Sequence, residues 1–282
     1  MARRLAFVVT EDWFFASHFL PMARAAAELG LAVDVITRVR AHRAAIEATG
    51  ARVIPLEAER RSLNVLAAGY AAGQLASVLR ETKPDIVHCI ALRSILIGGT
   101  AAAMAGIERR VFALTGLGYL GVRGGLVGRT ARWLIRLLVT DVLMTKRTRF
   151  LFENEDDPRL LGLDPSDTTR VTIVGGAGID PETLHLGVAP PLPPLRIAMV
   201  SRMLWSKGAD VAVAALRIAR ERGVPMELSL YGAPDPSNPR AVPEGQLRAW
   251  SEEPGIDWRG PTDDIEAVWR DHHVACLPSR GG

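Results

Sequence analysis

The stretch RIAMVSRMLWSKGAD, Arg196 to Asp210, decides the fold class of this sequence. An apolar run from Ile197 to Val200 is followed by a glycine-containing loop and then by apolar residues at helical spacing, which predicts a strand, a loop and a helix. Loops at the carboxyl ends of strands are where α/β sheets bind ligands. We therefore expect Arg202 and Lys207 to lie at a ligand-binding edge.

Two cations ahead of a helix N-terminus would suit a diphosphate, because both the side chains and the helix end supply positive potential or N–H donors. The alternative is a pair of solvated surface charges, which is the usual role of a lone arginine and lysine. The position of Arg202 and Lys207 at a strand end favours the ligand interpretation.

Apolar runs and helical patterns alternate along the whole chain before this stretch. Such alternation specifies parallel strands with crossover helices on both faces of a sheet. The sequence therefore predicts a doubly wound α/β domain over residues 1–180, with strands in the runs LAFVVT, AVDVIT, ARVIPL, PDIVHCI, RVFALTG, RFLFEN and RVTIVGG.

A proline-rich segment separates this domain from a second one. Residues 181–194 contain five prolines in fourteen residues, which forbids a helix and favours an extended linker. The alternation restarts over residues 195–282 but stops directly after an expected strand, with too few crossovers to cover a sheet. We expect this second α/β domain to be incomplete.

Composition places the chain among ordinary globular proteins. It has 282 residues, of which 48% are hydrophobic and 23% charged, with a net charge of +3. Its two cysteines, Cys89 and Cys276, lie in apolar runs and are expected in the core of a protein in a reducing compartment. Glu11 and Asp12 interrupt the apolar run near the N-terminus, so we expect a cytoplasmic protein without an export signal or a membrane span.

Two glycine clusters follow strands of the first domain. Gly175, Gly176 and Gly178 in IVGGAGID would let the backbone approach a ligand, although an interdomain turn explains them equally and their spacing is not that of a dinucleotide fingerprint. A second cluster, LTGLGYLGVRGGLVGR, includes Thr115 and Tyr119. It suits either a ligand-approaching loop or a disordered surface loop.

The segment RTARWLIRLLVTDVLMTKRTR is basic and amphipathic. Arg129, Arg132, Trp133 and Arg136 lie in its first part, and Asp141 is its only acidic residue. This pattern suits the surface of an anionic membrane. A crossover helix that packs its apolar side on the sheet explains it as well, whereas no motif supports binding to nucleic acid.

Polar residues follow the first expected strand, in TEDWFFASHF. Glu11, Asp12 and His18 could hydrogen-bond hydroxyl groups or act as acid and base, and helix capping is the alternative for Asp12. His272 and His273 have no carboxylate or cysteine at metal-ligand spacing, so no metal site is expected.

Several of these motifs together resemble the retaining family-4 glycosyltransferases of the GT-B fold, which have two Rossmann-like domains. The resemblance rests on GAGID, SRMLWSKGAD, GPTDDIEAVW and HVACLPS in this order, and on SHFLPMARAAAELG near the N-terminus. TGLGY and FENEDD are similar to the subgroup that extends lipid-diphosphate-linked sugars in bacterial surface polysaccharide synthesis.

The resemblance implies an enzyme that moves a hexose from a nucleotide-sugar donor, UDP- or GDP-linked, without a tightly bound cofactor. Arg202 and Lys207 would bind the donor diphosphate. The implied acceptor is a lipid-linked sugar at the inner face of the plasma membrane. Loops around the donor would include Gly175, Gly176, Gly178, Gly232 and Gly260, and the acceptor side would include Glu11, Asp12, His18, Thr115 and Tyr119.

The sequence departs from the family at two places. The family's two glutamates, separated by seven residues, normally follow the strand near Ser279, and the sequence reaches only Gly282, so we expect a C-terminal truncation. Many relatives have a histidine where this chain has Thr115. The alternatives that stay open are a noncatalytic fragment or nucleotide-sugar-binding module, a nucleotide-sugar epimerase and, least favoured without a dinucleotide fingerprint, an oxidoreductase.

Overall fold

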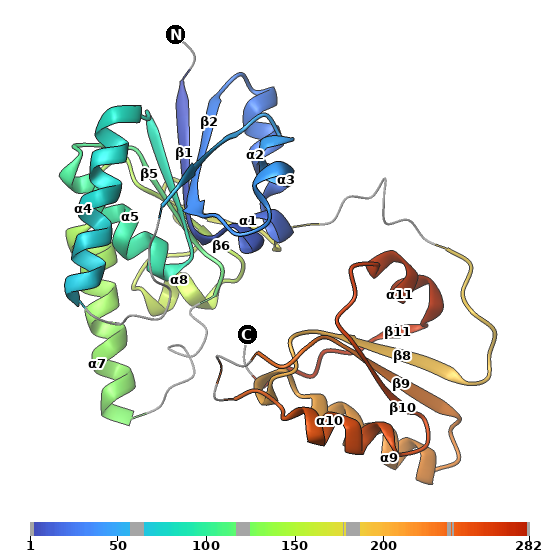
Figure 1. Cartoon of the computed structure of the whole chain (residues 1–282). Coiled ribbons are helices and arrows are strands. Elements are labelled where there is room, and N and C mark those ends of the chain that lie inside the picture. Colours follow the sequence, from blue (N-terminus) through green and yellow to red (C-terminus); the bar gives the residue numbers. More distant parts are fainter. Residues whose placement is uncertain are drawn as a thin grey trace. The chain divides into compact units, whose positions relative to one another are not determined.

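The chain forms two compact units, Met1–Gly178 and Ile179–Gly282, each with its own parallel sheet (Figure 1). The structure is a computed structural model, and it describes residues 3–56, 65–116, 125–176, 178, 187–235, 238 and 240–280. Each unit is described by itself below.

The sheet of the first unit has seven parallel strands in the order β3-β2-β1-β4-β5-β6-β7. This order results from right-handed crossovers that run first in one direction from β1 and then in the other. The strands are β1 (Arg4–Glu11), β2 (Ala32–Arg38), β3 (Arg52–Pro55), β4 (Ile86–Ile90), β5 (Arg110–Leu114), β6 (Arg149–Phe152) and β7 (Val171–Ile173).

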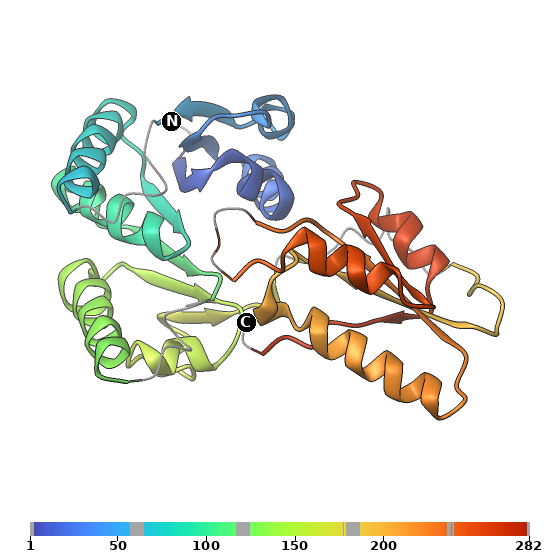
Figure 2. The same cartoon turned by 60° about the horizontal axis from the view of Figure 1, so that its bottom comes forward.

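Helices cover both faces of this sheet, so its strands are apolar on both sides. In β1, Leu5, Phe7 and Val9 face the α1–α3 side, whereas Ala6 and Val8 face the opposite core. The helices α4, α5 and α7 lie together on that opposite side (Figure 2). The helices of the unit are α1 (Asp12–His18), α2 (Leu20–Glu28), α3 (Arg43–Glu47), α4 (Val65–Thr82), α5 (Leu92–Met104), α7 (Gly125–Arg136), which continues as the π-helix η1 (Leu137–Val142), and α8 (Asp156–Leu160).

Glycine lets α5 pack closely on the centre of the sheet. A Cβ atom on Gly98 would lie 2.7 Å from the Sγ atom of Cys89, which is itself fully buried in β4. Burial raises the pKa of the Cys89 thiol to about 12, so this cysteine is an inert part of the core. Both cysteines of the chain are free.

The second unit repeats the start of the same winding. Its four parallel strands have the order β10-β9-β8-β11, and a core between them and α9 and α10 lies on one face, with α11 on the other (Figure 1). The elements are β8 (Leu195–Val200), the 3₁₀ turn η2 (Trp205–Lys207), α9 (Ala209–Glu221), β9 (Met226–Tyr231), α10 (Glu244–Ser251), β10 (Ile256–Gly260), α11 (Ile265–Asp271) and β11 (Val274–Ala275).

The predicted α/β class with two doubly wound, Rossmann-like sheets is confirmed. The decisive stretch forms β8, a loop and α9, as its pattern predicts. Among the described residues, none of the helices combines the length and hydrophobicity needed to cross a membrane.

Candidate functional site

Both sheets contain a point where the strand order reverses, between β1 and β4 in the first unit and between β8 and β11 in the second. The loops that leave the two central strands at such a point diverge to opposite faces of the sheet. This divergence opens a crevice at the carboxyl ends of the strands, where open α/β sheets bind their ligands.

In the second unit, the loops after β8 and β11 contact each other at this reversal. The loop after β8 ends at Gly208, which adopts a φ of 79° and precedes α9. A Cβ atom at Gly208 would collide with the carbonyl oxygen of Pro278, which lies after β11. Glycine is therefore required here both by the backbone conformation and by the close approach of the second loop.

Arg280 fixes the two loops to each other. Its backbone N–H donates to the carbonyl oxygen of Ser206 at 2.9 Å, and its guanidinium donates to the carbonyl oxygen of Trp205 and to the carboxylate of Asp210. These contacts hold the 3₁₀ turn that presents Lys207. Contacts from the loop after β11 to the turn and to the first turn of α9 thus position Lys207 before any ligand binds.

The two cations of the loop after β8 differ in their partners. The guanidinium of Arg202 lies 3.2 Å from the carboxylate of Asp235. Lys207 is half-buried, and within the described part of the chain its ammonium group has neither a hydrogen bond nor an ion pair. An unpaired ammonium group beside the N-terminus of the 13-residue helix α9 is an arrangement that attracts phosphate groups.

Gly232 lies at the same carboxyl edge of the second sheet, after the strand β9 that pairs with β8. It follows β9 with a φ of 134°, and its N–H donates to the carbonyl oxygen of Gly260, the last residue of β10, at 2.8 Å. A Cβ atom on Gly232 would collide with the carbonyl oxygen of Ser201. Gly232 thereby allows the ends of β8 and β9 to pack backbone against backbone.

We expect Gly232→Ala to lower the free energy of unfolding by about 2–3 kcal/mol, because the side chain demands a backbone shift at a strained φ. Gly245→Ala is the matched control: it lies in α10 with open space around it, so alanine should stabilise the helix by about 0.5–1 kcal/mol. Denaturant unfolding followed by circular dichroism measures both. Equal stability of the two variants would contradict the packing described here.

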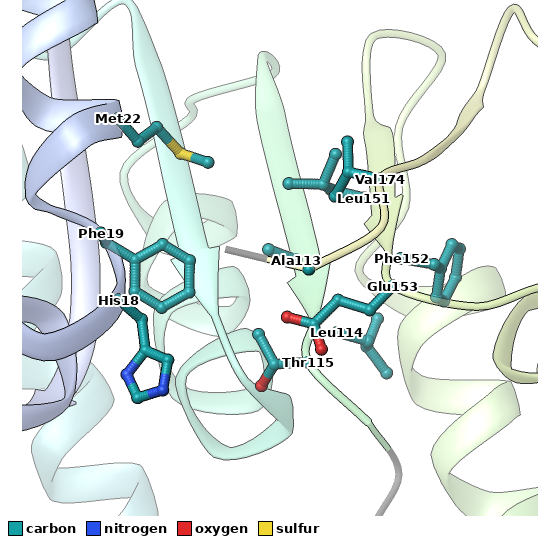
Figure 3. A pocket seen from close by; sticks show the side chains of 11 residues that line it. His18, Phe19, Met22, Ala113, Leu114, Thr115, Leu151, Phe152, Glu153 and Val174 are labelled. Carbon is teal, nitrogen blue, oxygen red and sulfur yellow. The ribbon is translucent and has the colours of Figure 1, made fainter. Parts of the chain in front are cut away.

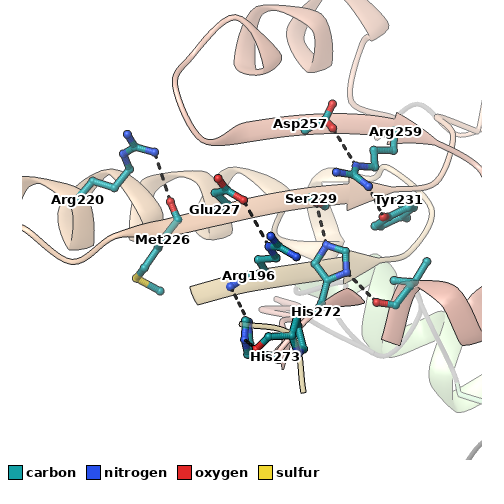
Figure 4. Close-up of polar contacts among 12 residues, drawn as sticks. Arg196, Arg220, Met226, Glu227, Ser229, Tyr231, Asp257, Arg259, His272 and His273 are labelled. Carbon is teal, nitrogen blue, oxygen red and sulfur yellow. Dashed lines mark hydrogen bonds and ion pairs between the residues drawn. The ribbon is translucent and has the colours of Figure 1, made fainter. Parts of the chain in front are cut away.

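The two histidines before β11 form hydrogen bonds to other segments of the second unit (Figure 4). His272 Nδ1 donates to the carbonyl oxygen of Val268 at 2.7 Å, so its Nε2 accepts from the hydroxyl of Ser229 at 3.0 Å. His273 Nδ1 accepts the N–H of Arg196, and its Nε2 donates to the carbonyl oxygen of Pro190. All four ring nitrogens are engaged, and the described residues contain no cluster of three metal-ligating side chains.

The first unit contains a pocket of about 120 Å³ between the α1–α2 corner and the carboxyl ends of β5, β6 and β7 (Figure 3). Its walls are mainly apolar, from Phe19, Met22, Leu151 and Val174 among others, and Gly176 contributes backbone. The polar side chains at its edge are His18, Thr115 and Glu153. An apolar pocket with a few convergent polar groups is the usual form of a small-molecule site.

The imidazole of His18 has one engaged nitrogen. Its Nδ1 lies 2.7 Å from the Ser17 hydroxyl and 3.2 Å from the carbonyl oxygen of Phe14. Because a carbonyl oxygen only accepts, Nδ1 carries the hydrogen in the neutral ring, and Nε2 keeps its lone pair. No hydrogen bond to Nε2 from another described residue occupies it, so it can accept one from a ligand.

Glu153 follows β6 directly and directs its carboxylate across the pocket toward Thr115 and the α1 side (Figure 3). Partial burial raises the pKa of this carboxyl, while nearby His18 lowers it and Asp157 raises it further. Neither carboxylate oxygen has a hydrogen-bond partner among the described residues. Sequence reasoning missed Glu153, although its place at a strand end in FENEDD was the available signal.

Asp12 lies in the interior instead of at the pocket. Its side chain is fully buried, and one carboxylate oxygen accepts the backbone N–H groups of Arg40, Ala41 and His42 at 2.7, 3.0 and 2.9 Å. It thereby anchors the loop after β2. Glu11 is also buried, with its carboxylate 3.8 Å from Arg38.

The other residues that the sequence predicted for the site lie after β7 and on α7. Gly175 and Gly178 follow β7, near Gly176 of the pocket wall, and Gly178 adopts a φ of 78°. Arg129, Arg132 and Arg136 lie on α7 with Trp133, and Tyr119 lies outside the described residues.

Exposed apolar side chains concentrate on α7 and η1. Trp133 is 59% exposed and Val142 is also 59% exposed, and the exposed residues between them are Leu134, Leu137 and Leu138. Arg129 and Arg136 on the same helix are exposed as well. We call these apolar and basic residues of α7 and η1 the α7 face.

Comparison with known proteins gives a family match and a fold. Residues 4–141 match the family model described as glycosyl transferase 4-like, whereas no curated protein matches the sequence. A glycosyltransferase from Rickettsia africae is 15% identical with a TM-score of 0.70, over 99% of this chain and 73% of that chain.

Two further structures are similar over almost the whole chain. HepE from Anabaena, in complex with UDP-glucose, is 12% identical with a TM-score of 0.71, over 98% of this chain and 74% of that chain. Sucrose-phosphate synthase from Thermosynechococcus elongatus is 14% identical with a TM-score of 0.73, over 98% of this chain and 75% of that chain. The chain therefore has the GT-B fold, and the match of residues 4–141 to the glycosyl transferase 4-like family supports its assignment as a transferase.

Proposed function

We propose that the protein is a retaining glycosyltransferase that moves a hexose from a nucleotide-sugar donor to a sugar acceptor. The observation that carries this proposal is the half-buried ammonium group of Lys207, which has no ion pair among the described residues and lies at the strand-order reversal of the second unit. A structural neighbour of the same fold, HepE, holds UDP-glucose. The donor diphosphate in this chain would lie against Lys207 and the first turn of α9.

This position of Lys207 suits the chemistry of sugar transfer. Cleavage of the bond between the sugar and the diphosphate moves negative charge onto the leaving diphosphate. A fixed cation there stabilises the transition state more than the ground state, because the charge it faces grows during the step. Arg202 would join Lys207 once the diphosphate replaces Asp235 as the partner of its guanidinium.

Titration of the full chain with UDP-glucose and with GDP-mannose tests the proposal. We expect at least one of the two to bind with enthalpy detectable by isothermal titration calorimetry and to bind more tightly than the corresponding nucleoside. The nucleoside comparison isolates the contribution of the diphosphate. Binding of neither nucleotide sugar, or equal affinity for uridine and UDP-glucose, would contradict a donor site built on Lys207.

For the acceptor we propose a lipid-diphosphate-linked sugar of cell-surface polysaccharide synthesis. The pocket beside β5–β7 offers apolar walls and polar groups that suit a sugar ring. The α7 face offers exposed tryptophan and leucine side chains next to arginines, a combination that suits an anionic lipid surface. Peripheral membrane contact through the α7 face would bring the enzyme to such an acceptor.

The Trp133→Glu variant tests this contact. We expect its affinity for vesicles of phosphatidylglycerol to fall by about tenfold or more, since it loses an interfacial ring and gains a charge of the same sign as the lipid. Tyr70→Glu on α4 is the control, because Tyr70 is 69% exposed but lies outside the α7 face. Cosedimentation with these vesicles and with neutral phosphatidylcholine vesicles measures the effect, and equal binding by both variants would exclude the α7 face as the contact.

A further inference from the structure

The pocket of the first unit carries three polar groups that keep bonding capacity when only the described residues are considered. The Thr115 hydroxyl and the Nε2 atom of His18 can pair with hydroxyl groups of a ligand, and Glu153 offers a carboxylate. The three come from the end of β5, the end of α1 and the residue after β6, so three separate elements converge on one small volume (Figure 3).

His18 is the described residue of the pocket wall that lowers the pKa of Glu153. The described residues that line it include no lysine or arginine, and the acidic Asp157 lies near enough to raise the pKa of Glu153 further. Asp157 itself is buried and hydrogen-bonded to the side chain of Asn154. A ligand that enters the pocket therefore meets negative potential from one side and apolar walls from the others.

We propose that Glu153 determines which acceptor sugar the enzyme takes: it binds hydroxyl groups of a neutral hexose and excludes sugars that carry a carboxylate. A carboxylate accepts hydrogen bonds from two adjacent hydroxyls of a sugar ring, which donate to its two oxygens. A uronate placed there would set two like charges close together, which disfavours its binding. The inference rests on the proposed function, because it takes the pocket as the acceptor site.

Selection by repulsion is an efficient way to discriminate between sugars of the same size. A hexose and its uronate differ by one oxidised carbon and have nearly the same shape, so the apolar walls of Phe19 and Met22 cannot separate them. A fixed charge can, because specificity depends on the difference between two affinities and a clash with the wrong ligand raises that difference.

The test uses p-nitrophenyl glycosides of glucose, galactose and mannose in both anomers, together with the matching β-glucuronide, as ligands of the full chain. We expect at least one neutral glycoside to bind and the β-glucuronide to bind at least about tenfold more weakly than the β-glucoside. In Glu153→Gln this ratio should collapse, because the amide keeps the size and most hydrogen bonds of glutamate but removes its charge. The glucuronide should gain affinity while the glucoside loses little.

Glu155→Gln is the matched control. Glu155 lies two residues further along the same loop, is exposed, and pairs with Arg159 instead of lining the pocket. It should keep the wild-type preference for the neutral sugar. Unchanged discrimination in Glu153→Gln, the same collapse in Glu155→Gln, or no binding of any glycoside to the wild type would each overturn the proposal.

Donor titration separates this inference from the proposed function. Glu153→Gln should bind UDP-glucose or GDP-mannose like the wild type, because Lys207 lies in the other unit. If the nucleotide sugar binds but the glycosides show no discrimination, the inference about Glu153 fails and the donor site stands. If the glycosides behave as expected and no nucleotide sugar binds, the proposed function fails.

Discussion

Replacement of Lys207 by alanine should lower sugar transfer by about a hundredfold or more at saturating donor. Among the described residues the Lys207 ammonium group has no ion pair, and under the proposed function the leaving diphosphate needs its charge most when the glycosidic bond breaks. Removal of one preorganised electrostatic group from an active site commonly costs a factor of about 100 to 1,000 in rate. Transfer of labelled sugar from UDP-glucose or GDP-mannose is the measurement.

Two controls make this result specific. Arg222→Ala removes an exposed cation from the opposite end of α9, and it should leave the rate nearly unchanged. The circular dichroism and unfolding midpoint of Lys207→Ala should match those of the wild type, because no described contact of the fold depends on the ammonium group. Transfer retained in Lys207→Ala would refute its role in the donor site.

Replacement of Asp12 by alanine should lower the free energy of unfolding by about 4 kcal/mol. Its carboxylate satisfies three backbone N–H groups of the loop after β2, and each buried donor left unsatisfied costs about 1–3 kcal/mol. Asp12→Asn should cost less, because the amide oxygen can still accept these bonds. Urea denaturation measures both, and a loss below about 1 kcal/mol in Asp12→Ala would contradict the anchoring role.

The cost of the Asp12 replacement should depend on pH. Burial by itself would raise the pKa of this carboxyl, but the N–H groups of His42, Arg40 and Ala41 outweigh it and hold the pKa below the ordinary 3.8. The folded state therefore releases this proton more readily than the unfolded state, so the stabilisation is complete above the ordinary pKa and is lost as the pH falls through the lower, folded value. The difference between wild type and Asp12→Ala should shrink in acid, and a difference that grows there would contradict this assignment.

Much of the fold follows from hydrophobic patterning. Strands such as β1 and β4 are buried on both faces, so they are read directly as short apolar runs, and the helices between them are amphipathic. The pattern after Arg129 was less informative. It predicts one basic helix, but α7 ends at Arg136 and continues as a π-helix, because the hydrogen bonding of the backbone is not encoded by apolar spacing.

The sequence predicts a site residue correctly where its position follows from the end of a nearby strand. The sequence predicts that Lys207 lies at the carboxyl edge of the second sheet, because an apolar strand pattern, a loop and a glycine follow one another there, and the structure has β8 and the turn η2 at these residues. The interior position of Asp12 depends on the loop after β2, almost thirty residues away, which no local pattern specifies. FENEDD contains four acidic residues, and only the path of the chain after β6 decides that Glu153 lines the pocket.

A crystal structure of the full chain with UDP would test the central claim most directly. We predict that the diphosphate lies at the crevice between the loops after β8 and β11, with an oxygen within hydrogen-bond distance of Lys207 Nζ and others at the N–H groups of the first turn of α9. Arg202 should turn from Asp235 to the phosphate. UDP bound elsewhere on the chain, with Lys207 free of phosphate, would contradict the proposed donor site.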